Sequence, residues 1–202
     1  MSAFLGPIHF WLYNKIQIQQ ELLDEILTLT NDLFPGLKEG LDTKYGKSET
    51  RALEEVIDQG NIHGWLQSSI SKVEYKLANS VTHIIKNSPE VLPKIETIFE
   101  TKGEEKSSLT ITSSAADAYK AISDCLLDGM PCDHANSVLE ESEEKVIWKR
   151  NSCVHTKYWE EVGGNIDIYY SLREAFIMGF LKKTQLVYEK VDEVTNIIRR
   201  TA

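Results

Sequence analysis

Two cysteine–histidine pairs are the residues of this chain that could most readily do chemistry. Cys132 and His134 form the first pair, and Cys153 and His155 form the second. In an extended segment residues i and i+2 point to the same side, so each pair can present a sulfur and an imidazole together. Two thiolates and two imidazoles are a ligand set suited to Zn²⁺ or iron. The spacing therefore predicts a divalent metal, Zn or Fe, held at these four residues.

The segment between the two pairs must bring them together. Its sequence, SVLEESEEKVIWKR at residues 137–150, has a Glu content that favours a helix and a Val146–Trp148 run that favours a strand. We predict a β-hairpin near residues 137–150 that turns at the acidic residues 141–144. His9 is a fifth candidate metal ligand, because the helix dipole disfavours its proton in a first helical turn.

The same residues allow a second chemistry without a metal. Cys132 or Cys153 could form a thiolate–imidazolium nucleophile with a histidine, and Asp133 or Asn136 could orient it. Haem is a less favoured ligand, and the absence of a C-x-x-C-H motif excludes covalent attachment. Cysteine is also often buried for packing alone. The alternative to a small-molecule hydrolase or sensor is therefore a non-catalytic helical scaffold that forms homo-oligomers.

Bulk composition narrows the class of protein. The 202 residues are 42% hydrophobic and carry a formal net charge of −9, which fits one globular domain spanning residues 1–202. An acidic chain repels phosphate backbones and anionic membranes, so we expect neither nucleic acid nor membrane as a partner. Three cysteines are too few for a disulfide scaffold, and no stretch reaches about 18 apolar residues. We expect a cytoplasmic protein with a small-molecule ligand.

Hydrophobic spacing predicts a mainly α (α+β) fold with six to eight helices around the small hairpin. Gly103 is expected to stop a helix and to begin an internal linker at residues 103–108, and residues 109–112 alternate like a short strand. Ser114 and Asp117 have the spacing of a capping box. Gly179 is expected to leave room for a close helix crossing. The helices are predicted at residues 8–33, 49–58, 62–86, 89–101, 114–127, 166–181 and 184–200, with a short one at Tyr158–Trp159.

Two further features concern binding. Arg173 stands among Tyr169, Tyr170 and Glu174, and its guanidinium could hold a ligand carboxylate bidentately or pair with a neighbouring Glu. The apolar faces of the last and first helices are expected to pack across a homodimer interface.

Part of the second half resembles a known group of proteins. Residues Val146–Cys153, followed by Tyr158 and Trp159, resemble the corresponding part of the L-2-amino-thiazoline-4-carboxylate hydrolase-like proteins and the related 4-vinyl reductase domain. The similar stretch runs over residues 138–182. The resemblance implies an α+β fold with a small-molecule pocket near the cysteine, and it assigns Cys153 to that pocket.

Overall fold

The computed structural model describes residues 4–201. The chain forms two compact units, and each is described here by itself. The first unit consists of Met1–Leu92 and His155–Ile166, and the second consists of Pro93–Val154 and Asp167–Ala202. The division does not fall at the predicted linker, residues 103–108. That the whole chain behaves as a single domain stays a prediction.

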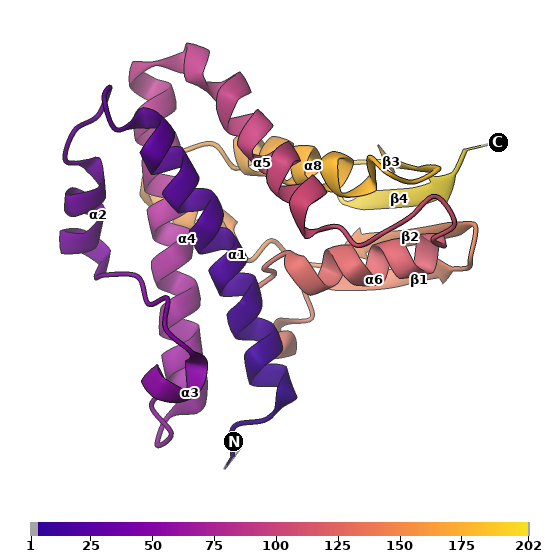
Figure 1. Cartoon of the computed structure of the whole chain (residues 1–202), viewed down its shortest axis with the longest axis horizontal. Helices are drawn as coiled ribbons and strands as arrows, with labels where there is room; N and C mark the ends of the chain where they lie inside the picture. The colour runs from indigo at the N-terminus through magenta and orange to yellow at the C-terminus, as the bar shows by residue number, and fades with distance from the viewer. Residues whose placement is uncertain (1–3, 202) are drawn as a thin grey trace. The chain divides into compact units, whose positions relative to one another are not determined.

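In the described residues of the first unit, all regular secondary structure is helical. Its two long helices are α1 (Pro7–Thr30) and α4 (Ile62–Asn87), which pack against each other (Figure 1). Both agree with the spacing of the apolar residues in the sequence. The shorter elements are α2 (Leu37–Tyr45), α3 (Leu53–Val56), the 3₁₀ turn η1 (Pro89–Val91) and α7 (Thr156–Glu161). Among residues 4–201, no helix combines the length and apolarity needed to cross a bilayer.

Helix α2 is absent from the sequence-based prediction. It is nine residues long and buries mainly Leu41, which packs in one cluster with Leu23 and Leu27 of α1. A single buried residue in so short a helix gives little periodicity to detect. The helix predicted over residues 49–58 is in fact confined to Leu53–Val56.

The second unit combines helices with a small sheet. Strands β1 (Asn136–Glu141), β2 (Lys145–Arg150), β3 (Leu186–Lys190) and β4 (Thr195–Arg200) form an antiparallel sheet in the order β1-β2-β4-β3. The predicted hairpin near residues 137–150 is confirmed as β1 and β2. The helices are α5 (Leu92–Lys106), α6 (Ala115–Cys125) and α8 (Ile166–Leu181), with a 3₁₀ turn η2 (Pro131–Asp133). Residues 4–201 thus hold eight α-helices and four strands, which confirms the mainly α, α+β class.

The predicted last helix over residues 184–200 is wrong. Residues 186–200 form the β3–β4 hairpin, whose turn is fixed by Asp192, since its Oδ1 accepts hydrogen bonds from the N–H groups of Val194 at 2.8 Å and Thr195 at 2.7 Å. Ile198 of β4 is fully buried and pairs with Val146 of β2. The valine and isoleucine spacing mimicked a helix, but β-branched residues suit a paired strand better. A homodimer interface on a last helix is therefore excluded.

Helices α5 and α8 cross closely, as predicted for Gly179. A Cβ on Gly179 would lie 1.9 Å from the Glu100 carbonyl oxygen, and one on Gly103 would lie 2.1 Å from the Phe176 carbonyl oxygen. The prediction that Gly103 stops a helix is wrong, because α5 continues to Lys106. Gly103 is instead needed inside the helix, where any side chain would meet the backbone of α8.

Helix α6 lies on the sheet, in contact with β2 and β4 (Figure 1). Its predicted capping box is confirmed, since Ser114 Oγ accepts from the Asp117 N–H at 3.0 Å and Asp117 Oδ2 accepts from the Ser114 N–H at 3.2 Å. The helix ends at Cys125, before the predicted Leu127. The strand predicted over residues 109–112 does not form, because this segment is a turn in which the Thr110 N–H donates to Ser113 Oγ.

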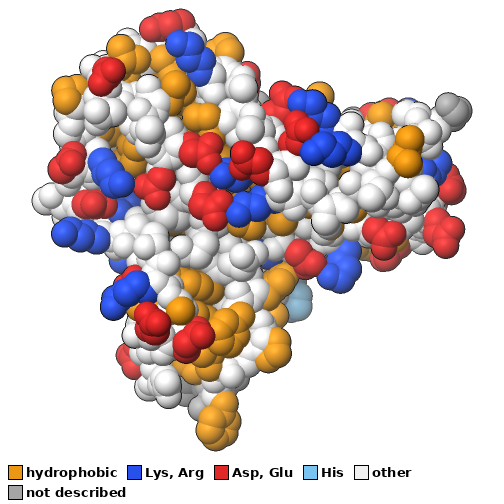
Figure 2. All heavy atoms as spheres, viewed as in Figure 1, with side chains coloured by type: hydrophobic (Ala, Val, Ile, Leu, Met, Phe, Trp, Pro, Cys, Tyr) orange, Lys and Arg blue, Asp and Glu red, His pale blue; other side chains and the backbone are white. Residues whose placement is uncertain are grey.

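The surface carries interspersed acidic and basic side chains on the face shown in Figure 2, with a hydrophobic patch over α3 and the start of α1. Three exposed apolar residues stand at the start of α1: Phe4, Ile8 and Phe10. A homodimer contact through the first helix stays a prediction.

Candidate functional site

The first cysteine–histidine pair lies on a tight turn of the second unit. Pro131 starts the 3₁₀ turn η2, and Asp133 Oδ2 accepts the Met130 N–H at 2.8 Å, so residues 131–133 are curled rather than extended. His134 ends the turn with a left-handed φ of 47°. Cys132 and His134 are both exposed. The expectation that an extended backbone presents them side by side is therefore wrong for this pair.

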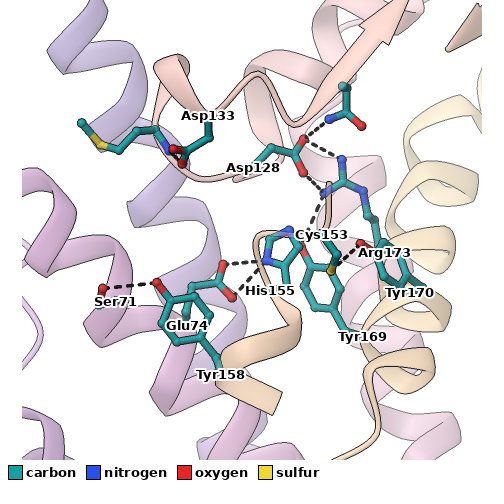
Figure 3. Close-up of polar contacts among 12 residues, drawn as sticks. Ser71, Glu74, Asp128, Asp133, Cys153, His155, Tyr158, Tyr169, Tyr170 and Arg173 are labelled. Carbon is teal, nitrogen blue, oxygen red and sulfur yellow. Dashed lines mark hydrogen bonds and ion pairs between the residues drawn. The ribbon is translucent and has the colours of Figure 1, made fainter. Parts of the chain in front are cut away.

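Cys153 belongs to a built polar environment in the second unit. It follows β2 by three residues and is partly buried, and the Tyr170 hydroxyl of α8 donates a hydrogen bond to its Sγ at 3.0 Å (Figure 3). Burial, and then the hydrogen bond to Cys153, raise the pKa of Tyr170 above its ordinary value. The phenol therefore keeps its proton at neutral pH and is the donor to sulfur.

Arg150 adds positive charge next to this pair. Its guanidinium carbon lies 4.0 Å from the centre of the Tyr170 ring, and its Nη2 donates to the Glu193 carbonyl oxygen at 3.0 Å. A cation over an aromatic face is an attractive arrangement that also fixes the ring. A hydrogen-bond donor to sulfur favours the thiolate form of a cysteine, and the guanidinium holds that donor's ring in place. Cys153 therefore has a fixed hydrogen-bond donor to its sulfur.

Arg173 lies on α8, three residues after Tyr170. Its Nη1 and Nη2 each donate at 2.8 Å to one oxygen of Asp128, and Nη1 also donates to the Tyr169 hydroxyl at 3.4 Å. Burial lowers the pKa of Arg173, but the Asp128 charge and hydrogen bonds raise it more, so the net shift is upward. Asn136 Nδ2 donates to Asp128 Oδ2 at 3.1 Å. The guanidinium is thus occupied by Asp128, which is distant in the sequence, and not by the neighbouring Glu174, which pairs with Lys190.

His155 lies in the first unit, at the start of α7. Its Nδ1 lies 3.1 Å from both carboxylate oxygens of Glu74 in α4, and the two side chains are only 2% and 1% exposed (Figure 3). A carboxylate can only accept, so Nδ1 carries a proton and points to Glu74. Nearby, the hydroxyls of Tyr158 and Ser71 are 3.2 Å apart. The buried His155–Glu74 pair anchors α7 to α4.

His9 has a local role at the start of α1. Its Nδ1 accepts the Gly6 N–H at 2.8 Å, which satisfies a backbone donor at the helix terminus. In residues 4–201, no three His, Cys, Asp or Glu side chains are grouped so that they could hold a metal ion. The metal site at Cys132, His134, Cys153, His155 and His9 has no structural support, and it stays a prediction for chemical analysis.

Sequence reasoning missed three important partners. Glu74 lies within the apolar stripe of α4, next to buried Val73, and a lone acid in such a stripe is a signal that it needs a partner. In the sequence, Tyr170 is only a polar residue of a predicted helix, and Asp128 is only a polar residue of a predicted turn. Their partners come from distant parts of the sequence, which a local pattern does not reveal.

Comparison with models of protein families, with curated proteins and with solved structures finds no match to this chain. The resemblance to the 4-vinyl reductase group therefore stays a prediction. The geometry of the described residues is the basis for assigning a function.

Proposed function

We propose that the protein binds a small electrophilic molecule and captures it through the thiolate of Cys153. The observation that carries the proposal is the 3.0 Å hydrogen bond from the Tyr170 hydroxyl to Cys153 Sγ. Arg150 against the Tyr170 ring supports it, because positive charge stabilises a thiolate. Cys153 is partly exposed, so a ligand can reach it.

The chemical step is a nucleophilic attack. The Sγ electron pair forms a bond to an electrophilic carbon of the ligand, and the bond from that carbon to its leaving group breaks with its electron pair. Tyr170 releases its hydrogen bond to sulfur as the negative charge moves to the leaving group. In this role Tyr170 positions and stabilises the nucleophile.

Alkylation by iodoacetamide tests the proposal within one chain, because the exposed Cys132 is an internal reference. Peptide mass spectrometry gives the alkylation rate of each cysteine at about pH 6 and about pH 9. We expect Cys153 to keep a larger fraction of its rate at the lower pH than Cys132, since a stabilised thiolate persists there. Dividing the rate of each cysteine at about pH 6 by its own rate at about pH 9 cancels the difference in exposure between the two thiols.

Tyr170→Phe should lower that fraction for Cys153 about tenfold, which corresponds to one hydrogen bond to a charged group. Tyr188→Phe is the matched control, because Tyr188 is a second phenol of the same unit and bonds Asn196 instead. If Cys153 follows Cys132 in both the wild type and Tyr170→Phe, the proposal fails and a non-catalytic helical protein is favoured.

Metal analysis distinguishes the predicted Zn or Fe site from the proposed reactive thiol. A stoichiometric Zn or Fe ion would protect the cysteines from alkylation, and a chelator would restore the reaction. Loss of that metal in a Cys132→Ser/Cys153→Ser variant would support the metal site and would contradict a free reactive thiol.

A further inference from the structure

A second candidate binding site lies in the first unit, far along the sequence from Cys153. A cavity of about 170 Å³ lies between α1, α4 and the segment of residues 47–49. A neighbouring cavity of about 180 Å³ shares Gln20, Lys47 and Ser48 as its wall. All three of these shared residues are polar, and they lie between the two cavities.

Gln20 is the first sign that the wall is built for a ligand. It lies on α1, is only 5% exposed and lines both cavities. Among residues 4–201 its side-chain amide makes no hydrogen bond to another protein group. Its amide atoms face the open cavities, so a ligand that displaces water there must supply a polar partner for them.

Ser48 adds a second donor. Its Oγ accepts a hydrogen bond from the buried Lys76 ammonium at 2.9 Å, and Lys76 also donates to Asp42 at 2.6 Å. A hydroxyl that accepts from an ammonium keeps its own proton for an acceptor. The Ser48 O–H is thus available to a ligand oxygen.

Two lysines give the cavity positive charge. Lys72 Nζ donates to the Lys47 carbonyl oxygen at 2.8 Å, and in the described part of the chain no carboxylate lies within ion-pair distance of either ammonium. The one acidic residue of the lining, Glu49, is held by Arg51 through hydrogen bonds of 2.9 and 2.6 Å, which lower the Glu49 pKa to about 2. The ammonium groups of Lys47 and Lys72 are therefore left to balance the charge of a bound anion.

One side of the cavity is apolar and flat, although the lining also includes Gln17, Ser68 and Ser69. The rings of Tyr13 and Trp65 have their centres 5.9 Å apart at an angle of 47°. The Tyr13 hydroxyl already donates to the Arg51 carbonyl oxygen at 2.9 Å, so its ring contributes an apolar face. Ile16 and Val73 complete this side.

We infer that this cavity binds a small organic anion, an aromatic monocarboxylate of one ring. The carboxylate takes the donors of Lys72, Lys47, Ser48 and Gln20, and the ring lies against Tyr13 and Trp65. The size agrees, because an apolar cavity of about 150 Å³ is known to hold benzene. The inference concerns the first unit alone and is independent of the thiol chemistry of Cys153.

Titration of the full chain with benzoate tests the inference, with benzamide as a neutral probe of the same shape and inorganic phosphate as an anion without a ring. Isothermal calorimetry should give saturable benzoate binding with a Kd of about 1 mM or tighter. Benzamide and phosphate should each bind more weakly. Equal binding of benzoate and benzamide, tighter binding of phosphate, or no saturation with benzoate would overturn the inference.

Lys72→Met removes the charge while it keeps most of the aliphatic stem. It should weaken benzoate binding about tenfold and leave benzamide binding unchanged. Lys86→Met is the matched control, since Lys86 is an exposed lysine of the same helix that does not line the cavity. An equal effect of both variants, or no effect of Lys72→Met on a folded protein checked by circular dichroism, would refute the site.

Discussion

The two units each contain a hydrogen-bonded pair of ionisable groups, and the pairs differ in their access to water. In the first unit Glu74 and His155 are 1% and 2% exposed. In the second unit Cys153 and Tyr170 are only partly buried. A pair that is buried from solvent cannot contact a ligand. Removal of one partner leaves the other as an unpaired charge in the core. A partly exposed thiol with a fixed donor can react.

The comparison separates a stabilising role from a chemical one. Glu74–His155 joins α4 to α7, whereas Tyr170–Cys153 joins α8 to the segment after β2. Polar groups found close together are therefore not equally good candidates for a functional site. Exposure and the availability of a nucleophilic atom decide between them.

The largest expected effect is on the buried pair. His155→Leu leaves the Glu74 carboxylate without its Nδ1 partner, and we expect the free energy of unfolding to fall by about 3–5 kcal/mol. Urea denaturation followed by circular dichroism measures it. The Glu74→Leu/His155→Leu double variant should lose less than the single variant, because no charge remains stranded. A single variant as stable as the wild type would contradict the assigned role.

The next effect concerns a second pair of the second unit, the ion pair between Arg173 and Asp128. Arg173→Met removes both hydrogen bonds to Asp128, whose carboxylate keeps partial access to water, and we expect a loss of about 2 kcal/mol in the free energy of unfolding. Lys149→Met, at an exposed position of β2, is the control and should have almost no effect. A larger loss in Arg173→Met than in His155→Leu would reverse the contrast between the units.

The smallest effect concerns a phenol at high pH. The hydrogen bond from Tyr75 to Glu161, followed by burial, raises the pKa of Tyr75 to about 12. Because the folded pKa exceeds the unfolded value, this contribution is complete below pH 10 and is lost as the pH rises through 12. We expect Tyr75→Phe to flatten the fall in stability over this range, as measured by urea denaturation at each pH. An unchanged slope would show that the hydrogen bond does not contribute.

The sequence determined the elements whose pattern is local. The stripes of α1 and α4, the capping box at Ser114 and Asp117, the hairpin after Asn136 and the space at Gly179 all follow from spacing or from one residue type. Long periodic helices and side-chain caps depend on near neighbours, so a single sequence reveals them.

Only the tertiary structure decided the C-terminal hairpin and the partners of the reactive residues. Thr195–Arg200 is a strand because β2 and β3 pair with it, and this pairing overrides the helical spacing of Val187, Val191, Val194 and Ile198. In the same way, Cys153 was predicted as a site residue, but its donor Tyr170 and the Glu74 partner of His155 come from separate helices. Spacing in the sequence determines which side chains can contact each other within one element, whereas the tertiary fold determines which distant side chains become their hydrogen-bond partners.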